Sequence, residues 1–154
     1  MLEGPEVPNV DPSSSRAVVI GFDFGSKNIG VAIGQRITGM AAPLRTIRLG
    51  QSQEPWRTIS EVVAAWRPAA FVVGLAYQFD GTENPITPAT ERFCQELERR
   101  YRIPVHRVDE TLSTAESRQR FYADNRSCRA LFRDLKDELA AQVILQTWLD
   151  ERDE

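Results

Sequence analysis

The chain opens with apolar runs that are typical of buried strands. Residues 17–24 are almost continuously apolar, which is the pattern of a central strand covered on both faces. A glycine-bearing turn separates this run from a second one at residues 29–35, and a third follows at residues 40–49. The opening part of the chain therefore predicts a three-stranded antiparallel meander.

The spacing of apolar positions then changes from that of a strand to that of a helix. A helix is predicted between Pro55 and Pro68, because proline begins a helix readily and does not continue one. Its apolar face is expected to carry Trp56, Ile59, Val63 and Trp66.

Strands and helices alternate through the rest of the chain. Residues 69–76 and 103–110 are short apolar runs that predict two further strands. Thr87, followed by a proline, predicts the start of a helix between them, and a capping box at Ser113 predicts another helix after them. The last helix is expected over residues 134–149.

This order of elements predicts an α/β fold. A meander followed by strand–helix–strand crossovers gives a mixed five-stranded sheet flanked by helices, with strands 4 and 5 parallel to strand 1. Residues 16–150 are expected to form this single domain. Residues 1–15, rich in proline and serine, are expected to be a disordered leader, and residues 151–154 an acidic tail.

The composition excludes several classes of protein. Hydrophobic residues make up 42% of the chain and charged ones 27%, as in soluble globular proteins. We find no membrane-spanning run and no signal peptide, so a cytoplasmic location without a membrane partner is expected. The two cysteines lie far apart without a C-x-x-C pair, which indicates neither a disulfide framework nor a thiolate zinc site.

The net charge of −3 is unevenly distributed along the chain. Residues 1–15 and 150–154 carry −3 each, which leaves residues 16–149 at +3. The excess of basic residues is concentrated at positions 118–136. This distribution is compatible with a nucleic-acid partner and also with an ordinary solvated surface.

Carboxylates are expected to converge at one edge of the sheet. Asp23 lies near the end of the first strand, and Asp109 and Glu110 end the fifth, which runs parallel to it. Asp137 opens the predicted last helix and heads its inward-facing stripe. Converging acids repel one another unless divalent cations such as Mg²⁺ or Mn²⁺ lie between them, and two such ions promote phosphodiester hydrolysis. Each acid also has a plain structural interpretation, as a turn cap, a strand-end charge or a helix-dipole partner.

Four blocks of the sequence resemble the YqgF family, also called RuvX, of bacterial RNase H-like nucleases. They are FDFGSKNIGVAIGQRITGMAAPL, VVGLAYQFDGTEN, VDETLSTAESR and KDELAAQVILQTWL, in that order, within residues 17–149. The resemblance implies an RNase H-like fold similar to that of RuvC-type Holliday junction resolvases. It also implies a metal-dependent nuclease that matures the 5′ end of pre-16S ribosomal RNA, or alternatively a resolvase of branched DNA.

The resemblance also assigns roles to single residues. By motif position, Asp23, Glu110 and Asp137 match the family's acids, which implies that they are catalytic and hold Mg²⁺ or Mn²⁺, with two ions expected. Asp109 belongs to the opposite face of its strand by the period of two, so Glu110 is preferred.

Other residues are candidates for phosphate contacts, because they are basic or lie at a turn or a helix start, where anions are favoured. They are Lys27, Ser113, Thr114, Arg118, Arg126, Arg129 and Arg133. Gly21 and Gly30 are expected to leave room beside Asp23 for ions or a phosphate backbone, while Gly25 serves the turn. His106 is expected to have a structural role in its strand.

The chain departs from the family pattern at two positions. Ala76 replaces a proline, and Thr111 replaces an arginine that could contact a phosphate.

Structured RNA or branched DNA is the expected partner, and the protein is expected to be a monomer or a weak homodimer.

Two rival functions stay open. One is a catalytically silent RNase H-like module that binds nucleic acid or an assembly partner. The other is an ATP-binding protein of the actin and sugar-kinase type, whose phosphate loop also reads D-x-G. Such proteins hold the nucleotide between two lobes, and 154 residues supply only one.

Overall fold

A computed structural model describes the fold of most of the chain. The described residues are 17–25, 27–50, 55–75, 87–109 and 129–152. The predicted leader and the helix predicted at Ser113 lie outside them. Of the acidic tail predicted at 151–154, residues 153–154 also lie outside them, whereas residues 151–152 belong to the last helix.

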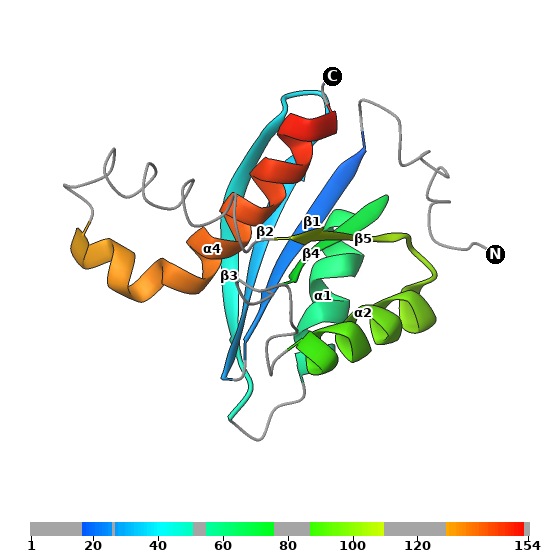
Figure 1. Ribbon diagram of the computed structural model, residues 1–154, viewed down its shortest axis with the longest axis horizontal. Helices are drawn as coiled ribbons and strands as arrows, with labels where there is room; N and C mark the ends of the chain where they lie inside the picture. The colour runs from blue at the N-terminus through cyan, green and yellow to red at the C-terminus, as the bar shows by residue number, and fades with distance from the viewer. Residues whose placement is uncertain (1–16, 26, 51–54, 76–86, 110–128, 153–154) are drawn as a thin grey trace.

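The described strands form one mixed sheet in the order β3-β2-β1-β4-β5 (Figure 1). The strands are β1 (Val18–Phe24), β2 (Asn28–Gln35), β3 (Met40–Arg48), β4 (Ala70–Leu75) and β5 (Val105–Asp109). β1 pairs antiparallel with β2, and β2 with β3, whereas β4 is parallel to β1 and β5 to β4. The predicted meander and the two parallel crossover strands are confirmed.

Helices α1 (Pro55–Trp66) and α2 (Thr87–Tyr101) cover one face of the sheet (Figure 1). Side chains from β1, including Ile20 and Phe22, pack there against both helices in one apolar core. The Phe22 and Phe93 rings meet edge to face with centroids 5.4 Å apart. This arrangement adds a specific ring contact to the burial of two large apolar side chains.

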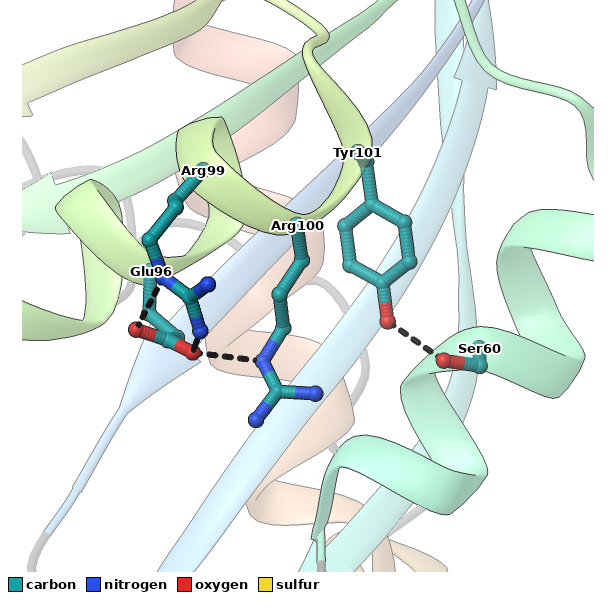
Figure 2. A network of polar contacts seen from close by, with 5 residues as sticks. All are labelled: Ser60, Glu96, Arg99, Arg100 and Tyr101. Atoms are coloured by element: carbon teal, nitrogen blue, oxygen red, sulfur yellow. Dashed lines mark hydrogen bonds and ion pairs between the residues drawn. The ribbon is translucent and has the colours of Figure 1, made fainter.

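Polar contacts join the two helices at their outer surface. The hydroxyls of Ser60 on α1 and Tyr101 on α2 are 2.6 Å apart and share a hydrogen bond (Figure 2). The Arg100 guanidinium lies 4.5 Å from the centre of the Trp56 ring, a cation–π contact between the same two helices. These contacts fix the helices against each other as well as against the sheet.

Helix α4 (Arg129–Arg152) covers the opposite face of the sheet (Figure 1). Ala141, Leu145 and Leu149 are buried there among apolar residues of β1, β2 and β4. The inward stripe predicted from the spacing of four is therefore confirmed.

Two details of the helices differ from the prediction. The last helix begins at Arg129, five residues earlier than expected, and ends at Arg152. Its alanine, leucine and arginine residues favour a helix, although their apolar spacing is weak at the start. On α1, Val62 joins Ile59 in the buried face, whereas the Trp66 side chain is 43% exposed near the C-terminal end of the helix.

Candidate active site

Asp23 lies near the carboxyl end of β1, on the side of the sheet that α4 covers. Side chains alternate along a strand, and Ile20 and Phe22 pack toward α1 and α2. Val19 packs in the α4 core, and a side-chain atom added at Gly21 would meet Leu145 of α4. Alternation therefore assigns Asp23 to the α4 face. The residue is half-buried at the end of the strand, and this position avoids the cost of a carboxylate in the core.

Gly30 brings the backbone of Asp137 next to this position. Gly30 is the antiparallel partner of Asp23 across β1 and β2. A Cβ atom on Gly30 would lie 1.8 Å from the carbonyl oxygen of Asp137 and 2.4 Å from its carbonyl carbon. The two predicted acids, which are distant in sequence, therefore come from adjacent positions: one on β1, the other on the turn of α4 that rests on β2.

This contact corrects the role expected for two glycines. Gly21 and Gly30 do leave space beside Asp23, but α4 fills it. The nearest atoms are the Leu145 Cβ to Gly21 and the Asp137 carbonyl oxygen to Gly30, at 2.8 and 1.8 Å from the added Cβ. Close helix–sheet packing, rather than room for ions, requires glycine at these positions. Gly25 serves the turn as expected, since its amide donates to the Asn28 carbonyl over 2.9 Å.

Asp137 does not open its helix as the sequence suggested. It is the ninth residue of α4, beyond the first turn in which the helix dipole stabilises an acid. The helix-dipole interpretation of this carboxylate is therefore wrong. The half-buried residue is instead placed by its backbone contact with β2.

Asp23 on β1 and Gly30 on β2 are paired, and β3 adds a third residue to this row across the sheet. Thr46 on β3 is the partner of Gly30, and its hydroxyl donates to the Glu138 carboxylate over 3.3 Å. Burial, together with the charge of Asp137, raises the pKa of Glu138, while the Thr46 hydrogen bond and the charge of Arg45 oppose that rise. Sequence reasoning missed Thr46 and Glu138. The one available signal was the pair of adjacent acids at positions 137 and 138.

Glutamines on α4 bind the outer edge of β3. The Gln146 side chain accepts from the Ala41 amide over 2.9 Å and donates to the Gly39 carbonyl over 2.7 Å. The Gln142 side chain donates to the Ala41 carbonyl over 2.8 Å. These bonds satisfy edge-strand groups that would otherwise be open to pairing with another chain. Glu138, Gln142 and Gln146 follow one another along α4 at a spacing of four residues. Their bonds to β3 fix the position of the helix along that strand.

Gln142 keeps one polar atom without a partner. Its Oε1 is buried and accepts no hydrogen bond within the described part of the chain. Because its Nε2 already binds the Ala41 carbonyl, the side chain cannot turn over without losing that bond.

Of the remaining predicted site residues, the structure describes some in full, some by their backbone alone and others not at all. Lys27 is exposed in the turn between β1 and β2, where its carbonyl accepts from the Leu49 amide over 2.8 Å. The backbone of Asp109 ends β5 at the carboxyl edge of the parallel strands. Glu110, Ser113, Thr114, Arg118 and Arg126 lie outside the described residues, as do the side chains of Arg129 and Arg133, whose backbones belong to α4.

The histidine and the described cysteine have structural surroundings. The His106 ring on β5 lies against the Trp148 ring of α4, with centroids 5.1 Å apart. The Cys94 side chain is fully buried on α2, and this burial raises the pKa of its thiol to about 12. At neutral pH the Cys94 thiol is therefore protonated and packed as an apolar group.

The described acids fit part of a divalent-metal site. Carboxylate oxygens are the ligands that Mg²⁺ and Mn²⁺ prefer, and Asp23 and Asp137 carry such oxygens on two separate elements, β1 and α4. Among the described residues there is no group of three or more acids, histidines or cysteines placed to hold a metal ion. The third expected ligand, Glu110, lies outside that part of the chain.

No helix within the described ranges is long and apolar enough to cross a membrane.

Comparison with known sequences gives a consistent result. Residues 17–151 match the family model described as RuvX: Holliday junction resolvase. A protein of Methylococcus capsulatus named "Putative pre-16S rRNA nuclease" is 59% identical over 138 residues, which cover 89% of this chain and 91% of that protein. A protein of the same name from Legionella pneumophila is 43% identical over 136 residues, covering 88% of this chain and 97% of that protein.

Solved structures share the fold at much lower identity. The RuvC of T. thermophilus in complex with a Holliday junction substrate superposes with a TM-score of 0.54 at 16% identity, over 90% of this chain and 96% of that one. The Fowlpox virus resolvase in complex with Holliday junction DNA gives 0.55 at 11% identity, over 87% of this chain and 97% of that one. At such identities the likeness establishes the fold alone, and it confirms the expected RNase H-like architecture of the RuvC type.

Proposed function

Because this chain belongs to the RuvX family, we propose that it is a metal-dependent nuclease that hydrolyses phosphodiester bonds. The observation that carries the proposal is the contact of Gly30 with the backbone of Asp137, one strand away from Asp23. The contact brings two acids from distant parts of the sequence to one edge of the sheet. Two carboxylates held at one edge would repel each other, and a divalent cation between them would offset that repulsion.

Three carboxylates hold the metal in this proposal. Asp23, Glu110 and Asp137 would together hold two Mg²⁺ or Mn²⁺ ions, with Asp23 shared between the ions and Glu110 and Asp137 each serving one. Val108 packs in the α4 core, so strand alternation favours Glu110 over Asp109 for the same side of the sheet. The ions supply a nucleophilic water at neutral pH and stabilise the charge on the leaving oxygen. No covalent intermediate with the protein is required.

The substrate we propose is the 5′ region of pre-16S ribosomal RNA, in the cytoplasm. This choice rests on the names of the relatives that are 59% and 43% identical. Branched DNA is the alternative, supported by the family description and by the fold shared with resolvases. Basic and hydroxyl-bearing residues contact phosphates in either case, at the seven positions predicted from the sequence.

Removal of one carboxylate tests the catalytic assignment. Asp23→Asn keeps the size of the side chain, so circular dichroism and the melting temperature should stay close to those of the wild type. Cleavage of structured RNA in Mn²⁺ should fall by at least about 100-fold, since a metal ligand is lost. Glu61→Gln, which removes an exposed acid of α1, should cleave at the wild-type rate. Equal rates for Asp23→Asn and the wild type would show that the assignment is wrong.

A second assay separates the two substrates. Pre-16S RNA and a four-way DNA junction are incubated side by side with the same enzyme, and initial rates are compared. Faster cleavage of the RNA supports rRNA maturation, and faster symmetric cutting of the junction supports resolution. Binding of both without cleavage in either metal would favour the catalytically silent module.

Melting curves distinguish the nuclease from a nucleotide-binding protein. A ligand that binds the native state raises its melting temperature in proportion to the logarithm of the ligand concentration. Mg²⁺ alone should stabilise the protein, and ATP without metal should not. Stabilisation by ATP alone would contradict the proposed metal site.

A further inference from the structure

Two basic side chains lie at the same edge of the sheet as the acids. Lys27 occupies the turn between β1 and β2, and Arg48 is the last residue of β3. The amide of Leu49 donates to the Lys27 carbonyl over 2.8 Å, which ties the end of β3 to this turn. Both side chains are exposed.

The strand register places Arg48 relative to Asp23. Asp23, Gly30 and Thr46 form one row across the three antiparallel strands. Arg48 follows Thr46 by two residues, so it belongs to the same face of the sheet about 7 Å further along, at roughly 3.4 Å per residue. The position of Arg48 is therefore at the rim of the proposed site, on the side of the edge strand.

The charges of Lys27 and Arg48 are not neutralised by nearby acids in the described part of the chain. On α2, by contrast, Glu96 pairs with both Arg99 and Arg100, as Figure 2 shows. Neither Lys27 nor Arg48 forms an ion pair with any residue within the described ranges. Two like charges on segments that the bond from the Leu49 amide to the Lys27 carbonyl holds together favour an anion between them.

We propose that Arg48, together with Lys27, binds a backbone phosphate of the nucleic-acid strand next to the bond that is cleaved. This inference rests on the proposed nuclease function and adds Arg48 to the contacts. A guanidinium presents a planar fork of donors that suits two oxygens of one phosphate. Such a contact positions the strand without reading its sequence.

The salt dependence of binding tests this inference without requiring cleavage. A fluorescein-labelled single-stranded RNA and a four-way DNA junction are titrated in EDTA, and anisotropy gives Kd between about 50 and about 200 mM salt. Each phosphate contact contributes about 0.7 to the slope of log Kd against log salt for a single strand and about 0.9 for a duplex. For the probe that contacts Arg48, Arg48→Gln should reduce the slope by the contribution of one phosphate contact. Arg48→Lys keeps the positive charge and should retain the wild-type slope.

Arg67→Gln is the matched control, because it removes an exposed arginine between α1 and β4, at the opposite edge of the sheet. It should leave Kd and slope at their wild-type values. An unchanged slope for Arg48→Gln on both probes, or an equal change in the Arg67→Gln control, overturns the inference. Loss of slope in Arg48→Gln without cleavage by any metal-loaded enzyme upholds the phosphate contact and refutes the nuclease function, so the two failures are distinguishable.

Discussion

Replacement of Gly30 by alanine should separate α4 from the sheet at the proposed active site. The added Cβ would lie 1.8 Å from the Asp137 carbonyl oxygen, whereas ordinary contact begins at 3.4 Å, a shortfall of about 1.6 Å. The obstructing atoms belong to the backbone of a helix, which cannot rotate away as a flexible side chain can. The helix must therefore move as a whole or the strand must bend.

The expected loss of stability is at the upper end of the range for overpacked cores. Overpacking typically costs 1–3 kcal/mol, so we expect about 3 kcal/mol for Gly30→Ala. At roughly 2–4 °C per kcal/mol for a chain of this size, the melting temperature should fall by about 6–12 °C. Displacement of the Asp137 backbone by about 1 Å should also lower the cleavage rate by about 100-fold at a temperature where the variant is folded.

Gly50→Ala provides the control for these measurements. No atom lies within 4 Å of a Cβ added at Gly50, so its stability should equal that of the wild type or exceed it by up to about 1 kcal/mol. Urea unfolding followed by circular dichroism measures both variants. Wild-type stability and cleavage in Gly30→Ala would refute the reasoning, because α4 would then not rest on β2 at this point.

Three further changes test other parts of the structure. Gln146→Ala leaves the Ala41 amide of β3 and the Gly39 carbonyl just before that strand without their partner. It should lower the free energy of unfolding by about 1–3 kcal/mol in urea, and no loss would show that α4 does not depend on this edge. Cys94, with its raised thiol pKa, should resist alkylation at about pH 8 in a Cys128→Ser background until urea unfolds the chain; rapid labelling of the native protein would contradict its burial. The hydrogen bonds from two arginines of α2 lower the pKa of Glu96, so its stabilising effect is present above the unfolded value of 4.5 and is lost as the pH falls through the lower folded value. The difference in melting temperature between the wild type and Glu96→Gln should therefore shrink on acidification, and a constant difference would argue against these pairs.

Most of the fold could be predicted because its signals are local. The apolar run of β1 and the prolines around α1 mark their elements within a few residues. The start of α4 was misplaced for the same reason, since the apolar spacing there is weak and only the helix propensity of its residues signals the true beginning.

The site could be predicted only in part, because its geometry depends on contacts between distant segments. A glycine in a strand indicates close approach, but the sequence does not tell what approaches, and at Gly30 it is the backbone of Asp137. The bond from Thr46 to Glu138 joins residues 92 positions apart, so no local pattern reveals it. The basic character of Arg48 was visible in the sequence, whereas its place at the rim of the proposed site follows from the strand register.

The central claim is that Asp23 of β1 and Asp137 of α4 act together on one metal site. Cleavage rates in Mn²⁺ of Asp23→Asn, Asp137→Asn and the double variant test it most directly, with Glu61→Gln as the exposed control. Residues that work as a unit lose most of their function with the first substitution. We therefore predict that each single variant loses at least about 100-fold and that the double variant is no slower than the slower single one. Losses that multiply in the double variant, or a single variant with wild-type activity, would contradict a shared site.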